Sequence, residues 1–179
     1  MKFFIINLFK YIFYFFYNLI NNKNYIIITP GLLGKLLKKI IIFDNTYKNF
    51  FSIKIRNKFD IITIFEIFAQ DFYNVKNLNI SDEINLIISK FKKNKLTPLI
   101  IDCGANIGCS GIYFEKMIEN CHVINIEPEE KNFSLLQLNC NSKIYKNINS
   151  AVSSKIIKFS IENLSNDDRA FRIKENQEG

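Results

Sequence analysis

The stretch Pro98-Leu-Ile-Ile-Asp-Cys-Gly-Ala-Asn-Ile-Gly108 decides the predicted fold. Its opening apolar run predicts a short parallel strand that is covered on both faces. Asp102 ends the run, and Gly104 permits a tight turn and a close approach of a ligand to the backbone. We expect Asn106 to cap the next helix and Gly108 to leave room for that helix to pack on the strand. Strand, glycine turn and helix in this order predict a ligand-binding crevice at the carboxyl edge of a sheet.

A second strand and a second acid follow the helix that is expected over residues 107–120. Residues 122–127 read His-Val-Ile-Asn-Ile-Glu, and Pro128 ends the run. Glu127 lies 25 positions after Asp102, which suits an acid that accepts hydrogen bonds from ribose hydroxyls at the tip of the second strand. The two acids therefore predict a cofactor that carries adenosine.

Two classes of cofactor compete for this crevice. A dinucleotide site favours Gly-x-Gly-x-x-Gly, with the pyrophosphate at the helix N-terminus. Here the pattern from Asp102 to Gly108 is Asp-x-Gly-x-x-x-Gly, and a pyrophosphate would meet the Asp102 carboxylate. The amino group and sulfonium of S-adenosylmethionine are cationic and suit that carboxylate better. The residues favour S-adenosylmethionine, with a nicotinamide-dependent dehydrogenase as the rival interpretation.

Several segments together resemble the FkbM-type methyltransferases, which are class I S-adenosylmethionine-dependent enzymes and mostly O-methyltransferases. The segment from Arg56 to Tyr73 is similar to the one that precedes the domain in that family. The segments that resemble sequence motifs of the family are Ile101–Gly108, Ile124–Pro128, Asn132–Asn139 and Ala151–Ser153.

The resemblance implies a Rossmann-like class I methyltransferase sheet with a defined set of cofactor contacts. Gly104 and the loop after it would face the methionine part, Glu127 would hold the ribose, and Pro128, Ser150 and Ala151 would lie near the adenine. The acceptor would be a small molecule or a carbohydrate, and no catalytic residue or metal ligand is predicted. The full cofactor-binding set comprises Asp102, Gly104, Ala105, Asn106, Gly108, Glu127, Pro128, Ser150 and Ala151.

The remaining pattern predicts three regions and an incomplete sheet. We expect a helical N-terminal extension over 1–48, a methyltransferase domain over 49–162 and a polar, disordered tail over 163–179. A third strand is expected over 143–152, with an antiparallel fourth over 155–161. A later segment of the family has no match, so the resemblance is to its N-terminal part only. The motif strand would then be an exposed edge, and either a partner supplies the missing half or the chain is a truncated, inactive form.

The region before the motif predicts several local elements. Lysines among leucines and isoleucines over 32–42 predict a basic amphipathic surface helix, and alternation over 51–55 predicts a half-buried strand. Asp60 is expected to cap a helix that runs to about Asp71. Ser81 is expected to cap another helix, which ends in lysines that suit the helix dipole.

Residues 3–20 are almost wholly apolar, but their polar side chains fall on one stripe of a helix. Lys10 would cost about 2.5–3.5 kcal/mol at the centre of a membrane. The pattern favours an amphipathic helix that lies on a membrane or packs on protein, with a spanning or signal segment as the alternative. We expect a cytoplasmic protein with membrane contact through 3–20. A non-catalytic, membrane-associated remnant or subunit is therefore a further rival function.

The net charge of +7 is uneven along the chain. Residues 1–99 hold 15 basic and 6 acidic residues, against 9 and 11 in 100–179. The basic excess lies outside the motif and indicates a solvated surface, or attraction to anionic lipid or nucleic acid. No interleaving of aromatic and basic residues typical of RNA binding occurs, so no nucleic acid partner is expected. The 4 cysteines lack metal-ligand spacing and, as buried thiols, fit a reducing compartment.

Overall fold

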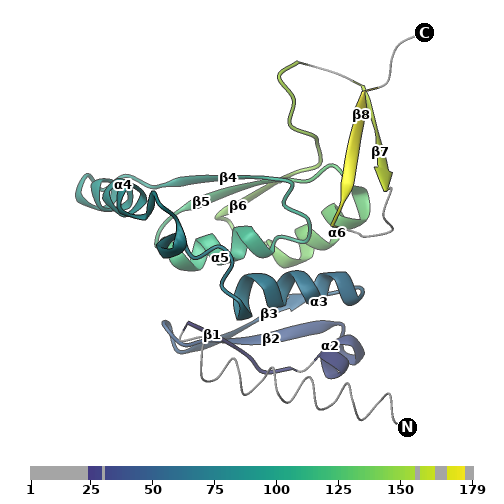
Figure 1. The fold of residues 1–179 in the computed structure, drawn as a ribbon, viewed down its shortest axis with the longest axis horizontal. Helices are drawn as coiled ribbons and strands as arrows, with labels where there is room; N and C mark the ends of the chain where they lie inside the picture. Colours follow the sequence, from purple (N-terminus) through teal and green to yellow (C-terminus); the bar gives the residue numbers. More distant parts are fainter. Residues whose placement is uncertain (1–23, 30, 156–157, 164–168, 176–179) are drawn as a thin grey trace. The chain divides into compact units, whose positions relative to one another are not determined.

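The computed structural model describes residues 24–29, 31–155, 158–163 and 169–175 (Figure 1). They form an α/β fold with antiparallel and parallel sheets. The α/β part of the predicted fold class is therefore confirmed. The chain divides into two compact units, Met1–Phe72 and Tyr73–Gly179. This division places residues 49–72 in the N-terminal unit. The sequence pattern places them in the predicted methyltransferase domain over 49–162.

The N-terminal unit contains a three-stranded antiparallel sheet in the order β1-β2-β3. The strands are β1 (Tyr25–Ile27), β2 (Lys39–Asp44) and β3 (Asn49–Lys54), and the short helix α2 (Gly31–Leu37) joins the first two.

The prediction of a helical extension is wrong for this part of the chain, and so is the continuous helix over 32–42. The helix stops at Lys38, which has a φ of 52°. The β-branched run that follows is a poor continuation of a helix and fits a pleated surface. Ile40 and Ile42 are fully buried on one face of β2, so packing in the sheet decides the conformation. The strand expected over 51–55 is confirmed as part of β3.

An aromatic cluster fills the core of this unit. The Tyr25 and Phe68 rings meet edge to face at 5.1 Å, and Phe51 lies 5.5 Å from Phe68. Edge-to-face pairs at such distances add to the free energy of burial.

The helix after the sheet begins one turn earlier than predicted. In α3 (Lys58–Ile64) the N-cap is Asn57, not Asp60, and Asp60 is the third residue of a capping box. The helix continues as a π-helical turn, η1 (Phe65–Ala69). Asp60 is 2% exposed and accepts hydrogen bonds from the Arg56 guanidinium. It therefore has two roles, as the reciprocal partner of the cap and as one half of an ion pair.

The second unit opens with the short helix η2 (Val75–Asn77) and with α4 (Ser81–Lys93). The N-cap of α4 is Ile80, so Ser81 is the first helical residue and not the cap. Basic residues occupy the last turn, as predicted, and no residue of α4 is buried. Its apolar side chains, such as Leu86 at 54% exposure, therefore lie at the surface of this unit.

The motif forms a three-stranded parallel sheet in the order β4-β5-β6. Its strands are β4 (Leu99–Cys103), β5 (His122–Ile126) and β6 (Tyr145–Ile148). The crossover helices α5 (Cys109–Met117) and α6 (Glu130–Asn139) lie on the same side of the sheet (Figure 1). Right-handed crossovers that step in one direction place both helices on one face. The arrangement is compatible with part of a Rossmann-like fold.

The expectation that β4 is covered on both faces is wrong. Leu99 and Ile101 are 56% and 57% exposed, because they point to the face that α5 and α6 do not cover. Among the described strands β4 pairs only with β5, so the predicted exposed edge is confirmed.

The last two strands form a separate two-stranded antiparallel sheet of β7 (Phe159–Asn163) and β8 (Phe171–Glu175). The predicted fourth strand is thus shifted, and it does not pair with β6. The prediction of a disordered tail is wrong for β8, where Phe171 and Ile173 alternate with charged residues and give β7 a partner.

The apolar segment 3–20 lies outside the described residues, and so do 164–168 and 176–179 of the predicted tail. In the part of the chain that the structure describes, no helix is long and apolar enough to cross a membrane.

Candidate functional site

The candidate site lies at the carboxyl edge of β4 and β5, where the motif loop closes over the strand ends. The backbone N–H groups of Gly104 and Ala105 both donate to the Ile126 carbonyl, at 2.8 and 3.0 Å. Gly108 N–H donates to the Ala105 carbonyl at 2.8 Å and completes the turn. The loop is therefore attached to the neighbouring strand and does not project freely from the sheet.

Gly104 has the conformation and the open surroundings that a ligand-binding turn needs. Its φ is +90°, which side chains rarely adopt, and a Cβ built on it would meet no atom within 4 Å. The backbone at this position is exposed, and the approach of a ligand to it stays a prediction.

Gly108 is needed for a different contact from the one predicted. A Cβ here would lie 2.5 Å from Cys140 Sγ and 2.8 Å from Leu136 Cδ1, so the loop packs on α6. The glycine that lets α5 approach the strand is Gly111, whose Cβ would lie 2.5 Å from Asn125 Oδ1. Gly111 could not be identified from the sequence, because a glycine inside a helix carries no turn signal.

Asn106 does not cap the helix, contrary to the prediction. The N-cap of α5 is Gly108, without a side-chain cap bond. Asn106 has a φ of 49°, and its backbone N–H donates to Glu127 Oε2 at 2.8 Å. Its buried Oδ1 has no hydrogen-bond partner among the described residues. Asn tolerates left-handed backbone better than most residues, which explains its use in this turn.

Asp102 points toward α5, where its Oδ2 accepts a hydrogen bond of 2.5 Å from the Ser110 hydroxyl. Burial raises the pKa of Asp102, and the Ser110 bond partly offsets this rise. No cation pairs with this carboxylate in the described part of the chain. A cationic ligand at this edge would stabilise its charged form.

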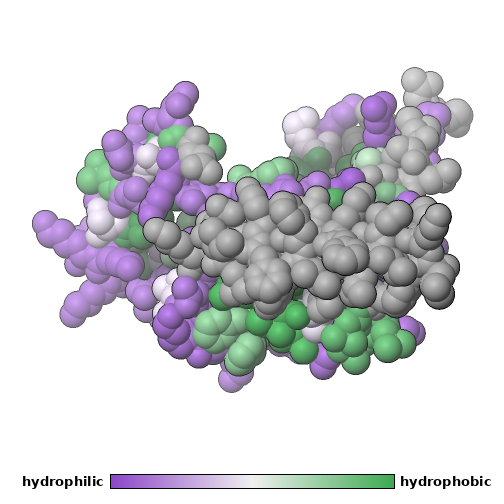
Figure 2. Space-filling view, turned by 60° about the horizontal axis from the view of Figure 1, so that its bottom comes forward, coloured by the Kyte–Doolittle hydropathy of each residue, from purple (hydrophilic) through white to green (hydrophobic). Residues whose placement is uncertain are grey.

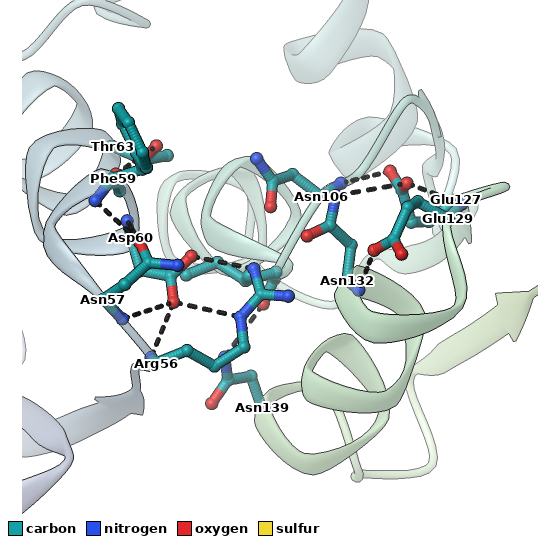
Figure 3. A network of polar contacts seen from close by, with 11 residues as sticks. Arg56, Asn57, Phe59, Asp60, Thr63, Asn106, Glu127, Glu129, Asn132 and Asn139 are labelled. Atoms are coloured by element: carbon teal, nitrogen blue, oxygen red, sulfur yellow. Dashed lines mark hydrogen bonds and ion pairs between the residues drawn. The ribbon is translucent and has the colours of Figure 1, made fainter. Parts of the chain in front are cut away.

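Glu127 is 4% exposed, and its carboxylate is the centre of a polar network (Figure 3). In addition to the Asn106 bond, Oε1 accepts from Glu129 N–H at 3.0 Å and from Asn132 Nδ2 at 3.5 Å. Burial raises the pKa of Glu127, while the N–H donors of Glu129 and Asn106 lower it. A carboxylate offers about four lone-pair sites, so the network leaves room for about one more donor.

The two acids share one side of the sheet at one edge. Asp102 is bonded to a residue of α5 and Glu127 to a residue of α6, and both helices cover the same face (Figure 1). Glu127 also connects the motif loop to the start of α6, whose N-cap is Glu129. The structure thus brings the predicted pair of acids to neighbouring strand ends.

The residues expected near the adenine lie beside the same edge. Asn149 Nδ2 donates to the carbonyls of Glu127 and Pro128, at 2.9 and 3.3 Å. This bond holds the segment after β6 against the end of β5. Ser150 and Ala151 follow directly and are half-buried.

Several residues that hold the site in place, mainly on α6 and β6, were not predicted from the sequence. Asn139 Nδ2 donates to the Ile107 carbonyl at 2.9 Å and fixes the loop from the far end of α6. Asn125 Nδ2 donates to Asn147 Oδ1 at 2.9 Å across the sheet. Asparagines are common in this sequence, so those with a structural role could not be distinguished from the others by sequence alone.

No alternative chemistry is favoured near this edge. Burial raises the pKa of the Cys140 thiol to about 12, so it is protonated and a weak nucleophile at neutral pH. The described residues contain no group of three or more His, Cys, Asp or Glu side chains that could hold a metal ion. A hollow of about 490 Å³ beside Pro98 lies at the other, amino end of β4.

No family model, curated protein or solved structure matches this chain.

Proposed function

We propose that the chain is the N-terminal part of a class I S-adenosylmethionine-dependent methyltransferase of the FkbM type, which acts on a hydroxyl of a small molecule or sugar. The observation that carries the proposal is the convergence of Asp102, the open Gly104 turn and Glu127 at one edge of a parallel sheet. In open α/β sheets ligands bind at this edge.

Asp102 and Gly104 fit the cationic end of the cofactor. The Asp102 carboxylate lacks a cationic partner in the described residues, and the amino group of the methionine part would supply one. Gly104 has no side chain between its backbone and that group. Charge-assisted hydrogen bonds of this kind are roughly twice as strong as neutral ones.

Glu127 could accept a hydrogen bond from a ribose hydroxyl only at its one remaining acceptor site. Three of its acceptor sites are used by Asn106, Glu129 and Asn132. These bonds fix the orientation of the carboxylate in advance, so a ribose hydroxyl would meet a preorganised acceptor. Pro128, Ser150 and Ala151 would border the adenine.

The cofactor, when bound, supplies an activated methyl group on its sulfonium. The contribution of the protein to such a transfer is mainly the alignment of acceptor oxygen, methyl carbon and sulfur. No residue of this chain is assigned as a general base, and a partner that supplies further strands beside β4 would complete the acceptor side. A chain without that partner would bind the cofactor and leave the acceptor unmethylated.

Equilibrium titration of the purified chain with S-adenosylmethionine and with NADH tests the proposal. We expect S-adenosylmethionine to bind, and Asp102→Asn to weaken its binding by about 10- to 100-fold, the loss of one hydrogen bond to a charged group. Asp82→Asn, the same change at an exposed site on α4, is the matched control and should not alter affinity.

The pH dependence of this binding gives a second readout. Binding requires the ionised Asp102, so affinity should rise as pH increases through the raised pKa of that carboxyl. It should fall again where the amino group of the ligand loses its proton, at about pH 8. Binding of NADH without S-adenosylmethionine would instead support the dehydrogenase, and binding of neither would support a non-catalytic remnant.

A further inference from the structure

The exposed charge of the N-terminal sheet is entirely positive. Residues 24–55 contain one acid, Asp44, and it is 1% exposed. Lysines supply the rest of the charge in this range, and all of them are exposed: Lys35, Lys38, Lys39, Lys48 and Lys54. Exposed lysines without exposed acids in this range favour the binding of anions.

Four of these lysines gather where α2 ends and where β2 begins and β3 ends. Lys39 and Lys54 are direct partners across the antiparallel pair. Like charges directly opposite each other destabilise a sheet. Lys38 precedes Lys39 in left-handed backbone, and Lys35 lies in the last turn of α2.

Leucines form an exposed apolar ridge beside these lysines. Leu33, Leu36 and Leu37 share one face of α2 by their spacing, and they are 43%, 79% and 44% exposed. The helix meets the sheet through Gly34, where a Cβ would lie 2.2 Å from Ile40 Cδ1. The described residues of this unit therefore leave these leucines uncovered. Figure 2 shows a group of hydrophobic residues along the lower edge of the view, bordered by hydrophilic residues.

We propose that the end of α2 and the adjoining ends of β2 and β3 form a docking surface for anionic lipid membranes. The leucines would enter the acyl boundary, while the lysines would reach the phosphate and carboxylate groups of the lipid. This surface is made of described residues only. It is also independent of the proposed cofactor site.

A nucleic acid is the less suitable anion for this surface. Single strands bind through aromatic side chains on which bases stack. Here the exposed aromatics Tyr47 and Phe50 lie at the opposite end of the β2–β3 hairpin from Lys39 and Lys54. Among the described residues, the exposed apolar side chains of α2 are leucines.

The other basic helix is a weaker candidate for the same role. The first turn of α4 contains Asp82 and Glu83, so one end of that helix would repel an anionic surface.

Co-sedimentation of the full chain with vesicles tests the proposal. We expect stronger binding to phosphatidylcholine vesicles that contain phosphatidylserine than to phosphatidylcholine alone. Replacing Lys35, Lys38 and Lys39 by Gln should weaken binding to the mixed vesicles by about 100-fold, at about fivefold for each lysine. Leu36→Ser, at the most exposed of the leucines, should weaken binding to both vesicle types.

A matched control removes the same charge elsewhere. Lys131, Lys143 and Lys146 are exposed and lie on α6 and around β6, and their replacement by Gln should leave binding within about twofold. Equal losses in both triple variants would overturn the proposal, because net charge alone would then explain binding. Unchanged binding in the first triple variant and in Leu36→Ser would also overturn it. So would tighter binding of single-stranded RNA than of the mixed vesicles in the same buffer.

Discussion

At the scale of single residues, two glycines with the same backbone angle have different tasks. Gly104 and Gly108 have φ values of +90° and +91°. Only the second is in close contact with another element, because α6 packs against it. A side chain at Gly104 would therefore meet backbone strain alone, and one at Gly108 would meet strain and a steric clash.

We expect Gly108→Ala to lower the free energy of unfolding by about 2–5 kcal/mol, from left-handed strain together with overpacking against Leu136 and Cys140. Gly104→Ala should cost only the strain, about 1–2 kcal/mol. Urea unfolding followed by circular dichroism measures both values. Equal losses would mean that the Cys140 and Leu136 side chains move aside at little cost.

Asp102 and Glu127 also oppose folding at neutral pH. Burial raises the pKa of both carboxyls, so the folded chain holds their protons more tightly than the unfolded chain does. By linkage their contribution to stability is lost as pH rises from the unfolded value through the raised pKa. Two acids that reduce stability at one sheet edge are more easily explained by a ligand than by packing.

At the scale of elements, the sequence predicted the strands and helices of the motif well and their ends poorly. The strand, loop and helix around Gly104 could be predicted because the apolar run, the acid and the glycine are local signals. The N-cap of α5 and the contact of Gly111 with Asn125 could not, since they depend on where α6 and β5 lie.

The N-terminal sheet shows the same limit. Lysines between leucines and isoleucines over 32–42 fit a helix and a strand almost equally well. The pairing of Ile40 with Ile53 in the register of β2 and β3 decides in favour of the strand. That pairing joins residues 13 apart, so no short window of sequence contains it.

The capping box of α3 provides a test at this scale. Asn57 Oδ1 accepts from the backbone N–H groups of Phe59 and Asp60, at 2.8 and 3.4 Å. We expect Asn57→Ala to lower the free energy of unfolding by about 0.5–2 kcal/mol. Asn74→Ala, which removes a cap from the exposed three-residue helix η2, is the control and should cost less. Thermal unfolding of the two variants measures both changes in stability. A larger loss of stability for Asn74→Ala than for Asn57→Ala would contradict the assignment of Asn57 as the N-cap of α3.

At the scale of the whole molecule, the open edge of β4 is the main liability. The bonds of Pro98 and Gly104 to β5 set the alternation along the strand. By that alternation the backbone groups of Leu99, Ile101 and Cys103 point away from β5. Exposed, apolar strand edges recruit other strands. Any strand that pairs here would cover this edge, and copies of the chain would compete for it.

We therefore expect Ile101→Lys to reduce self-association of the isolated chain, because an edge lysine opposes strand pairing. Ile87→Lys changes a similarly exposed isoleucine, at 52% against 57%, on helix α4 and is the matched control. Light scattering over a concentration series measures the difference. Equal scattering from the two variants would show that exposed apolar area, and not the strand edge, drives association.

The stepwise order of β4, β5 and β6 also bears on synthesis. Parallel sheets are in general slow to form, because distant segments must meet before any contact is gained. Here each strand pairs with the next one along the chain, and every crossover steps the same way. The sheet can therefore grow strand by strand as the chain emerges from the ribosome, and the pairing of β4, β5 and β6 can form once Ile148 has left the exit tunnel.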